Sequence, residues 1–289
     1  MMQLKKQLHF STNMGRMGNQ MFQYACAKAM QSEQGYLSSV SHTDKIAYFK
    51  LDKGERFFNK IKSVLFFRLW KKIWGSEVLN TNLECLQRLY RNELRSIQKP
   101  TLVWGFFQSP VYFDSIREKI KEYFTVKDEY KEGFLSFMQE NRLQPGAYIA
   151  LHIRRTDYKG FVVPGLQGDD FTLPVSYFHA ALQQISNEEN LPVVFVSDEP
   201  DAIEGLFPEI KQKIISKNNE ITDFLILQHA GKLVISNSTY SWWAAYLNGF
   251  AGKNIYAPKY FLGFKEQKEI PVRIYPEAWR QVAVGAHLS

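Results

Sequence analysis

Two adjacent arginines at the end of an apolar run are the first feature of this sequence that suggests chemistry. The stretch LHIRRTDY occupies residues 151–158 and follows the apolar-rich residues AYIA at 147–150. Guanidinium groups form forked hydrogen bonds to phosphate oxygens and stay charged in a dry site. Arg154 and Arg155 therefore favour a diphosphate-binding site. The alternative is a surface ion pair closed by Asp157.

A second polar cluster follows the apolar run PVVFV at residues 192–196. Here Ser197 and Asp198 place a hydroxyl and a carboxylate directly after a predicted strand. A carboxylate in this place can accept hydrogen bonds from a guanine edge or from ribose hydroxyls. Asp198 can equally cap a helix that begins near Pro200, a frequent role of aspartate. The residues alone leave these two interpretations even.

A third cluster, SNSTYSWW at residues 236–243, is rich in hydroxyl groups. Its first four residues form a turn that runs into a predicted helix. Backbone N–H groups at a helix N-terminus, together with hydroxyls, are suited to binding phosphate. Capping of the helix by the same hydroxyls is compatible with that role. Trp242 and Trp243 are predicted to lie in the core, because their spacing to the next apolar residues is helical.

A fourth cluster, GRMGNQ at residues 15–20, lies between a predicted strand at 8–12 and a predicted helix at 19–30. Its G-x-x-G spacing matches neither a dinucleotide fingerprint nor a Walker loop. Asn19 and Gln20 either cap the helix or line a ligand-binding cleft. We favour the cleft slightly.

The elements that must position these clusters alternate between strand-like and helix-like patterns, which predicts βα units around parallel sheets. Further along the chain the patterns predict a strand at 101–107, a helix at 112–124, a strand at 147–153, a helix at 174–186, a strand at 192–197, a helix at 221–230, a strand at 232–236, a helix at 239–248 and a strand at 254–257.

The Pro-Gly pair within residues 141–148 indicates a junction between two halves. We therefore predict an α/β fold with two Rossmann-like domains, 1–145 and 146–289, facing a cleft. Ligands of such sheets bind at the carboxyl ends of the strands. Three polar clusters each follow a predicted strand, so they should converge on one site. This convergence favours the anion site over an isolated ion pair.

Composition narrows the class of protein further. The 289 residues carry a net charge of +7 and are 45% hydrophobic, which predicts a folded protein with an anionic partner. Two cysteines, Cys26 and Cys85, imply no disulfide framework. The start MMQLKKQLHF lacks the apolar core of a signal peptide. No apolar stretch approaches the roughly 20 residues of a membrane span. We expect a cytoplasmic protein.

One stretch leaves a peripheral membrane contact open. Residues 60–74, KIKSVLFFRLWKKIW, mix aromatic and basic side chains. Such a segment can lie on an anionic bilayer as an interfacial helix. The alternative is an ordinary helix that packs on the N-terminal domain. We favour the second, because the apolar residues do not form one clean face.

Several chemistries lack support in the sequence. It contains no H-E-x-x-H, no paired C-x-x-C and no G-x-S-x-G, so zinc hydrolysis and α/β-hydrolase chemistry are not indicated. An Asp-x-Asp triplet, the usual anchor of a metal–nucleotide-sugar complex, is also absent from the sequence. A basic site without acidic metal ligands must neutralise a diphosphate with arginines and helix dipoles. No metal and no other cofactor is therefore expected.

Seven motifs, in order, resemble those of the α-1,2-fucosyltransferases of glycosyltransferase family 11. They are GRMGNQMFQYA, WGFFQSPVYF, HIRRTDY, LPVSYFHAAL, SDEP, ISNSTYSWWAAYLN and APKYF. The likeness covers residues 9–262 and is weak over 40–100. This chain departs from the usual G-G-L-G-N-Q at Arg16 and Met17, and from H-I-R-R-G-D-Y at Thr156. Arg16 falls on the acceptor side of the cleft that the resemblance implies.

The resemblance implies a GT-B fold and metal-independent, inverting transfer of fucose from GDP-β-L-fucose to the 2-hydroxyl of a β-galactoside. Arg154 is then the diphosphate anchor, supported by Arg155. The other residues implied in donor binding are His152, Asp198, Ser236, Asn237, Ser238, Thr239 and Ser241. The residues implied on the acceptor side are Asn19, Gln20 and Gln108.

In the mechanism that this suggests, the acceptor hydroxyl attacks the anomeric carbon from the face opposite GDP. The arginines and the 236–239 turn stabilise charge on the leaving phosphate. Asp157 acts as a base or orients the arginines, and we favour the second role.

Two alternatives to this function stay open at this point. One is a fucosyltransferase of another linkage, such as α-1,6. The other is a non-catalytic polyanion binder, although no nucleic-acid module is recognisable and no nucleic-acid partner is expected.

Overall fold

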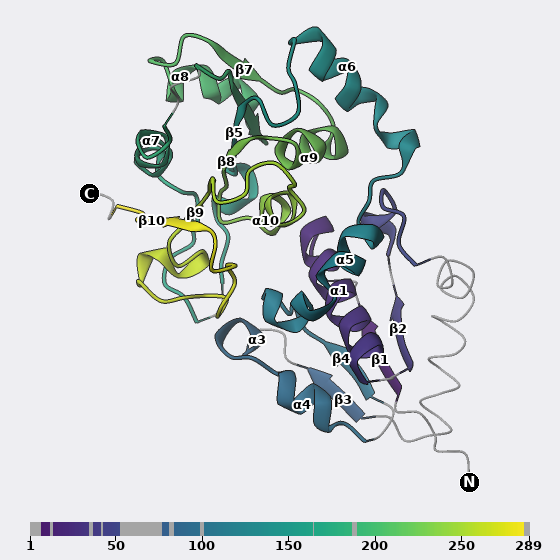
Figure 1. Cartoon of the computed structure of the whole chain (residues 1–289). Helices are drawn as coiled ribbons and strands as arrows, with labels where there is room; N and C mark the ends of the chain where they lie inside the picture. Colours follow the sequence, from purple (N-terminus) through teal and green to yellow (C-terminus); the bar gives the residue numbers. More distant parts are fainter. Residues whose placement is uncertain are drawn as a thin grey trace. The chain divides into compact units, whose positions relative to one another are not determined.

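The computed structural model describes residues 7–11, 14–34, 37–41, 43–52, 77–80, 84–98, 101–163, 165–186 and 190–285. The chain divides into two compact units (Figure 1). Unit 1 comprises residues 1–127 and 271–274, and unit 2 comprises 128–270 and 275–289. The stretch 60–74, for which an interfacial helix was one interpretation, lies outside the described residues.

Unit 1 is built on a four-stranded parallel sheet with strand order β2-β1-β4-β3. Its strands and helices are β1 (Gln7–Ser11), α1 (Met17–Gln34), β2 (Leu37–Ser41), β3 (Glu77–Asn80), α3 (Glu84–Gln87), α4 (Arg91–Ser96), β4 (Thr101–Trp104) and α5 (Arg117–Tyr123). Figure 1 shows α1, in purple, running along the sheet, and it contacts both β1 and β2. Residues 20–30 of α1 are all buried, so this helix supplies much of the core of unit 1.

The helix predicted at 112–124 is only partly confirmed. Two 3₁₀ turns, Pro110–Tyr112 and Asp114–Ile116, precede α5. Phe113 separates them with a non-helical φ of −144° and ψ of 2°, and it is fully buried. Burial of the Phe113 ring therefore takes precedence over the local helical spacing.

Unit 2 is built on a six-stranded parallel sheet with strand order β10-β9-β8-β5-β6-β7. Its strands and helices are α6 (Glu132–Glu140), β5 (Ile149–Ile153), α7 (Val175–Gln183), β6 (Val193–Ser197), α8 (Ile203–Leu206), β7 (Lys213–Ile215), α9 (Glu220–Gln228), β8 (Lys232–Val234), α10 (Thr239–Tyr246), β9 (Ile255–Pro258) and β10 (Arg280–Val282). From β5 the chain moves outward to β6 and β7, returns to β8 beside β5, and then moves outward the other way. This is the order of the Rossmann sheet.

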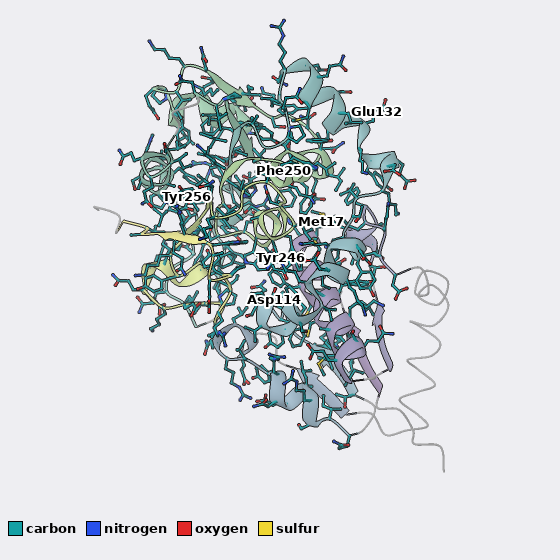
Figure 2. The ribbon with its side chains drawn as sticks, in the orientation of Figure 1. Met17, Asp114, Glu132, Tyr246, Phe250 and Tyr256 are labelled. Atoms are coloured by element: carbon teal, nitrogen blue, oxygen red, sulfur yellow. The ribbon has the colours of Figure 1, made fainter. Side chains whose placement is uncertain are left out.

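The core of unit 2 follows the apolar patterns of the sequence. Every residue of β5 is buried, as expected for a central strand of a parallel sheet. Trp242 and Trp243 are fully buried, so their predicted core role is confirmed. The Trp242 ring stacks on Tyr246, which Figure 2 labels, with centroids 4.9 Å apart.

The boundary between the units differs from the predicted junction at 145/146. Helix α6 belongs to unit 2, because it packs on α9 and places Phe134 against the His229 ring at 4.7 Å. The division therefore follows Lys127. Near the other end of the chain, residues 271–274 belong to unit 1. There Ser109 Oγ donates to the carbonyl of Arg273 at 2.6 Å.

Within the described residues, no helix combines the length and the apolar character that crossing a bilayer requires.

Candidate functional site

Three of the polar clusters come together at one edge of the unit 2 sheet. Strands β8, β5 and β6 are neighbours, and the clusters follow their carboxyl ends. Between β5 and β8 the chain changes direction across the sheet, so their outgoing loops diverge. In open parallel sheets, ligands bind at this switch point. The predicted convergence of the 151–158, 197–200 and 236–243 segments is confirmed.

A buried hydrogen bond spans the switch point itself. His152 Nδ1 lies 2.7 Å from Ser236 Oγ, and both side chains are buried. The His152 ring also packs on Tyr240, with centroids 5.3 Å apart. Burial, together with the neighbouring positive charge of Arg154, lowers the pKa of His152 to about 3. The imidazole is therefore neutral near pH 7 and offers hydrogen bonding rather than charge.

Arg154 is held by two carboxylates. Its Nε and Nη2 atoms each lie 2.6 Å from Asp157 Oδ1, and Nε lies 3.2 Å from Asp198 Oδ2. Burial opposes the charged form, but the Asp157 hydrogen bond and the Asp198 charge outweigh it and raise the pKa of Arg154. Within the described residues, Nη1 makes no hydrogen bond or ion pair with the protein. The predicted alternative, an ion pair with Asp157, is thus present, and it leaves donor capacity for a ligand.

Arg155 has a different carboxylate partner. Its Nε donates to Glu199 Oε2 at 2.8 Å, and Lys159 Nζ donates to Glu199 Oε1 at 2.7 Å. These two hydrogen bonds lower the pKa of Glu199. In the described part of the chain, neither Nη atom of Arg155 has a protein partner. Each arginine is therefore oriented through Nε, while Nη donors are left for an anion.

Asp198 organises the turn that carries the arginines. Its carboxylate accepts from the backbone N–H of Arg155 at 2.9 Å and of Thr156 at 3.1 Å, and from Thr156 Oγ1 at 2.5 Å. The interpretation as a helix cap is wrong, because Glu199 is the N-cap residue of the 3₁₀ turn at Pro200–Ala202. The interpretation as a guanosine ligand stays a prediction.

The hydroxyl-rich turn leads into α10, as predicted. Ser236, Asn237, Ser238 and Ser241 are all buried. Ser238 is the N-cap residue but makes no side-chain capping bond, so capping by its hydroxyl is not observed. The first backbone N–H groups of α10, beginning at Thr239, have no acceptor within the helix. Such groups bind anions, and the helix dipole adds to their positive potential.

Asn237 links this turn to the loop after β5. Its Nδ2 donates to the carbonyl of Phe171 at 2.9 Å, and its own carbonyl accepts from Tyr158 OH at 2.8 Å. Its Oδ1 is buried without a hydrogen-bond partner among the described residues. A buried acceptor in this condition is costly, so a ligand donor at this atom would stabilise the site.

One group near this edge escaped the sequence interpretation. Asp223 lies on α9 and accepts a 2.5 Å hydrogen bond from Ser216, which follows β7. Burial raises the pKa of Asp223 to about 7. The sequence signal that could have identified Asp223 is its position as an acidic residue inside the apolar run ITDFLIL. Tyr240, whose OH donates to the Glu220 carbonyl at 2.6 Å, was missed as the link between α9 and His152.

In unit 1, the structure brings together two of the residues predicted on the acceptor side. Gln108 follows β4, the neighbour of β1, and its Nε2 donates to Asn19 Oδ1 at 2.7 Å. Helix α1 begins at Met17, so Asn19 and Gln20 lie in its first turn and are not its caps. The Oε1 atoms of Gln20, Gln23 and Gln108 are buried without a hydrogen-bond partner among the described residues.

The described residues include no cluster of three His, Cys, Asp or Glu side chains that could hold a metal ion. Independence from metal stays a prediction for experiment.

Comparison with known proteins gives one family over nearly the whole chain. The model of glycosyl transferase family 11 matches residues 1–279. The O-antigen biosynthesis glycosyltransferase WbnK of Escherichia coli is 26% identical, over 90% of this chain and 97% of its own length. Human galactoside alpha-(1,2)-fucosyltransferase 1 is 25% identical, over 95% of this chain and 74% of its own.

Solved structures show the same fold. The fucosyltransferase NodZ from Bradyrhizobium has a TM-score of 0.55 at 11% identity, covering 83% of this chain and 93% of that chain. A second NodZ structure, the α-1,6-fucosyltransferase soaked with GDP-fucose, has a TM-score of 0.53 at 11% identity, covering 84% and 92%. The predicted α/β fold of the GT-B type, with two units built on parallel sheets, is confirmed.

Proposed function

Because the chain belongs to glycosyl transferase family 11, we propose that it transfers L-fucose from GDP-β-L-fucose to the 2-hydroxyl of a β-galactoside. The product is an Fuc-α-1,2-Gal linkage, formed with inversion and without a metal. The observation that carries this proposal is the pair of carboxylate-oriented arginines at the switch point beside the N-terminus of α10. The α-1,2 relatives support the linkage.

The donor diphosphate binds at the edge of unit 2. The Nη groups of Arg154 and Arg155 and the first N–H groups of α10 donate to the phosphate oxygens. Asp157 and Glu199 hold the guanidinium groups in place before the ligand arrives, so little reorganisation is needed. Asp157 is therefore a positioning residue in this mechanism. Asn237 Oδ1 and neutral His152 supply further hydrogen bonds to the nucleotide.

The reaction breaks the bond between the fucose anomeric carbon and the β-phosphate oxygen. The acceptor 2-hydroxyl oxygen attacks from the opposite face, which inverts β to α, and its proton passes to solvent water. Negative charge grows on the leaving GDP, where preorganised donors typically contribute about 3–4 kcal/mol each. In unit 1, Asn19, Gln20 and Gln108 bind acceptor hydroxyls, because amides both donate and accept hydrogen bonds.

The test is a transfer assay with GDP-fucose and a panel of β-galactosides, run with and without excess EDTA. NMR of the product is expected to show an α-1,2 linkage, and EDTA is expected to leave the rate unchanged. An α-1,6 product would refute the linkage. A strict requirement for added Mg²⁺ or Mn²⁺ would refute the metal-free chemistry. Salt-sensitive RNA binding without transfer would instead support the polyanion binder.

A further inference from the structure

The connection from β5 to α7 is unusually long for a parallel sheet. It runs from Arg154 to Pro174, whereas such connections commonly have about 2–6 residues. Long loops at the carboxyl edge of a sheet commonly serve binding or catalysis. This loop begins with the arginine turn itself, so its outer part lies next to the proposed diphosphate site.

The base of the loop is closed by hydrogen bonds. Lys159 and Asp170 form an antiparallel bridge, and the Phe171 N–H donates to the Tyr158 carbonyl at 3.0 Å. Asn237 binds both strands of this base, through Tyr158 OH and the Phe171 carbonyl. The base is thus tied directly to the buried turn before α10.

An aromatic stack rises from this base. The Phe161 ring lies on Tyr158, with centroids 5.5 Å apart and planes within 9° of parallel. The edge of Phe171 supports Phe161, with centroids 6.0 Å apart. Even so, 38% of Phe161 and 64% of Val162 remain exposed. The stack therefore presents an apolar surface to solvent. Only the Phe161 ring lies between this surface and Tyr158, the residue after Asp157.

The chemistry of this surface fits a sugar ring. The C–H groups on one face of a galactopyranose form an apolar patch, and hydroxyls surround it. A single aromatic ring matches that patch in size, and the exposed Asp169 in the same loop can accept from hydroxyls. A bilayer contact would instead need a wide apolar face with basic residues around it. Phe161 and Val162 offer only one ring and one aliphatic side chain, which fits a sugar better than a bilayer.

We propose that Phe161 and Val162 form a stacking platform for the acceptor sugar, and this rests on the proposed function. Unit 2 then contributes to acceptor choice as well as to donor binding. The platform binds a ring of the β-galactoside acceptor and makes no contact with GDP.

The experiment compares Phe161→Ala with wild type in the transfer assay. Loss of the ring is expected to raise the acceptor KM about 3–10-fold, the worth of one aromatic contact. The KM for GDP-fucose and the slow hydrolysis of GDP-fucose without acceptor are expected to stay unchanged. Phe161→Tyr and Phe161→Trp keep an aromatic ring, so their acceptor KM should stay near the wild-type value.

A matched control is Phe250→Ala. Phe250, labelled in Figure 2, is 50% exposed in the same unit, but it lies beyond the C-terminal end of α10 beside His229. It should leave both KM values unchanged.

The outcomes separate the platform from the proposed function. If wild type transfers fucose to no β-galactoside, the proposed function fails, and the platform fails with it. If wild type is active and Phe161→Ala keeps its acceptor KM, the platform alone is refuted. A comparable fall in the rate of acceptor-free GDP-fucose hydrolysis in Phe161→Ala would also refute the platform. The ring would then act by supporting the arginine turn. Binding to anionic vesicles that Phe161→Ala abolishes, with the acceptor KM unchanged, would assign the surface to a membrane.

Discussion

Ion pairs orient the arginines at the carboxyl edge of the unit 2 sheet, whereas an amide–amide hydrogen bond joins two polar side chains of unit 1. In unit 2, Arg154 and Arg155 are oriented by the carboxylates of Asp157 and Glu199. In unit 1, the corresponding contact is the 2.7 Å hydrogen bond between Gln108 and Asn19. Both edges also bury polar oxygens without a hydrogen-bond partner among the described residues.

The difference fits the two ligand chemistries that we propose for the two edges. A diphosphate carries fixed negative charge, which guanidinium groups and a helix N-terminus neutralise. A sugar hydroxyl is neutral and both donates and accepts, as an amide does. We therefore expect substitutions in the arginine turn of unit 2 to affect the donor and the chemical step, and substitutions at the amide edge of unit 1 to affect the acceptor.

The largest expected effect is that of Arg154→Lys. The variant keeps the positive charge but cannot hold Asp157 and donate to phosphate from one rigid fork. We expect kcat for fucose transfer to fall about 10²–10³-fold, the loss typical of one preorganised donor to a developing anion. The matched control is Arg117→Lys, a partly exposed arginine that pairs with Asp114 in unit 1. Wild-type kcat in Arg154→Lys would contradict the diphosphate role.

The second prediction concerns Asp223, a unit 2 acid that burial keeps largely protonated up to pH about 7. Because its folded pKa is raised, the neutral form stabilises the fold at low pH, and this contribution is lost as pH rises through about 7. Asp223→Asn cannot ionise. Between pH 5 and pH 8, wild type should therefore lose about 2–3 kcal/mol of unfolding free energy relative to the variant.

Urea unfolding followed by tryptophan fluorescence at the two pH values measures this difference. The control is Asp201→Asn, an exposed acid paired with Lys217 in the same unit. The stability of this variant relative to wild type should hardly change between the two pH values. A pH-independent offset for Asp223→Asn would show that the carboxyl is ionised in the fold.

The smallest expected effect is in the amide edge. Gln108→Met keeps the volume but removes the hydrogen bond to Asn19 and a buried acceptor. A neutral hydrogen bond is worth about 0.5–1.5 kcal/mol, so the acceptor KM should rise about 3–10-fold. The Kd of GDP, measured by calorimetry, should stay unchanged. The control is Gln98→Met, an exposed glutamine of unit 1. A weaker GDP affinity in Gln108→Met would contradict the assignment of this edge to the acceptor alone.

Much of the unit 2 fold could be predicted from its apolar runs. Strands β5, β6, β8 and β9 lie where the sequence predicted them, because buried parallel strands are nearly continuous apolar segments. Short elements were missed. Strands β7 and β10 have three residues each and lie at the sheet edges. Most of their side chains are at least partly exposed, so the sequence shows no clear apolar pattern there. Helix α6 was missed as well, and with it the boundary after Lys127.

The sequence by itself determined the family, the parallel sheets and the gathering of polar clusters at strand ends, because these depend on local pattern and on motif order. Tertiary structure alone decided which partner each polar group has. Asp198 holds the arginine turn, Glu199 orients Arg155, and Tyr240 covers His152. These contacts join residues far apart in the chain, and the energy of a polar group depends on burial and on the partner it meets. Neither can be read from spacing along the sequence.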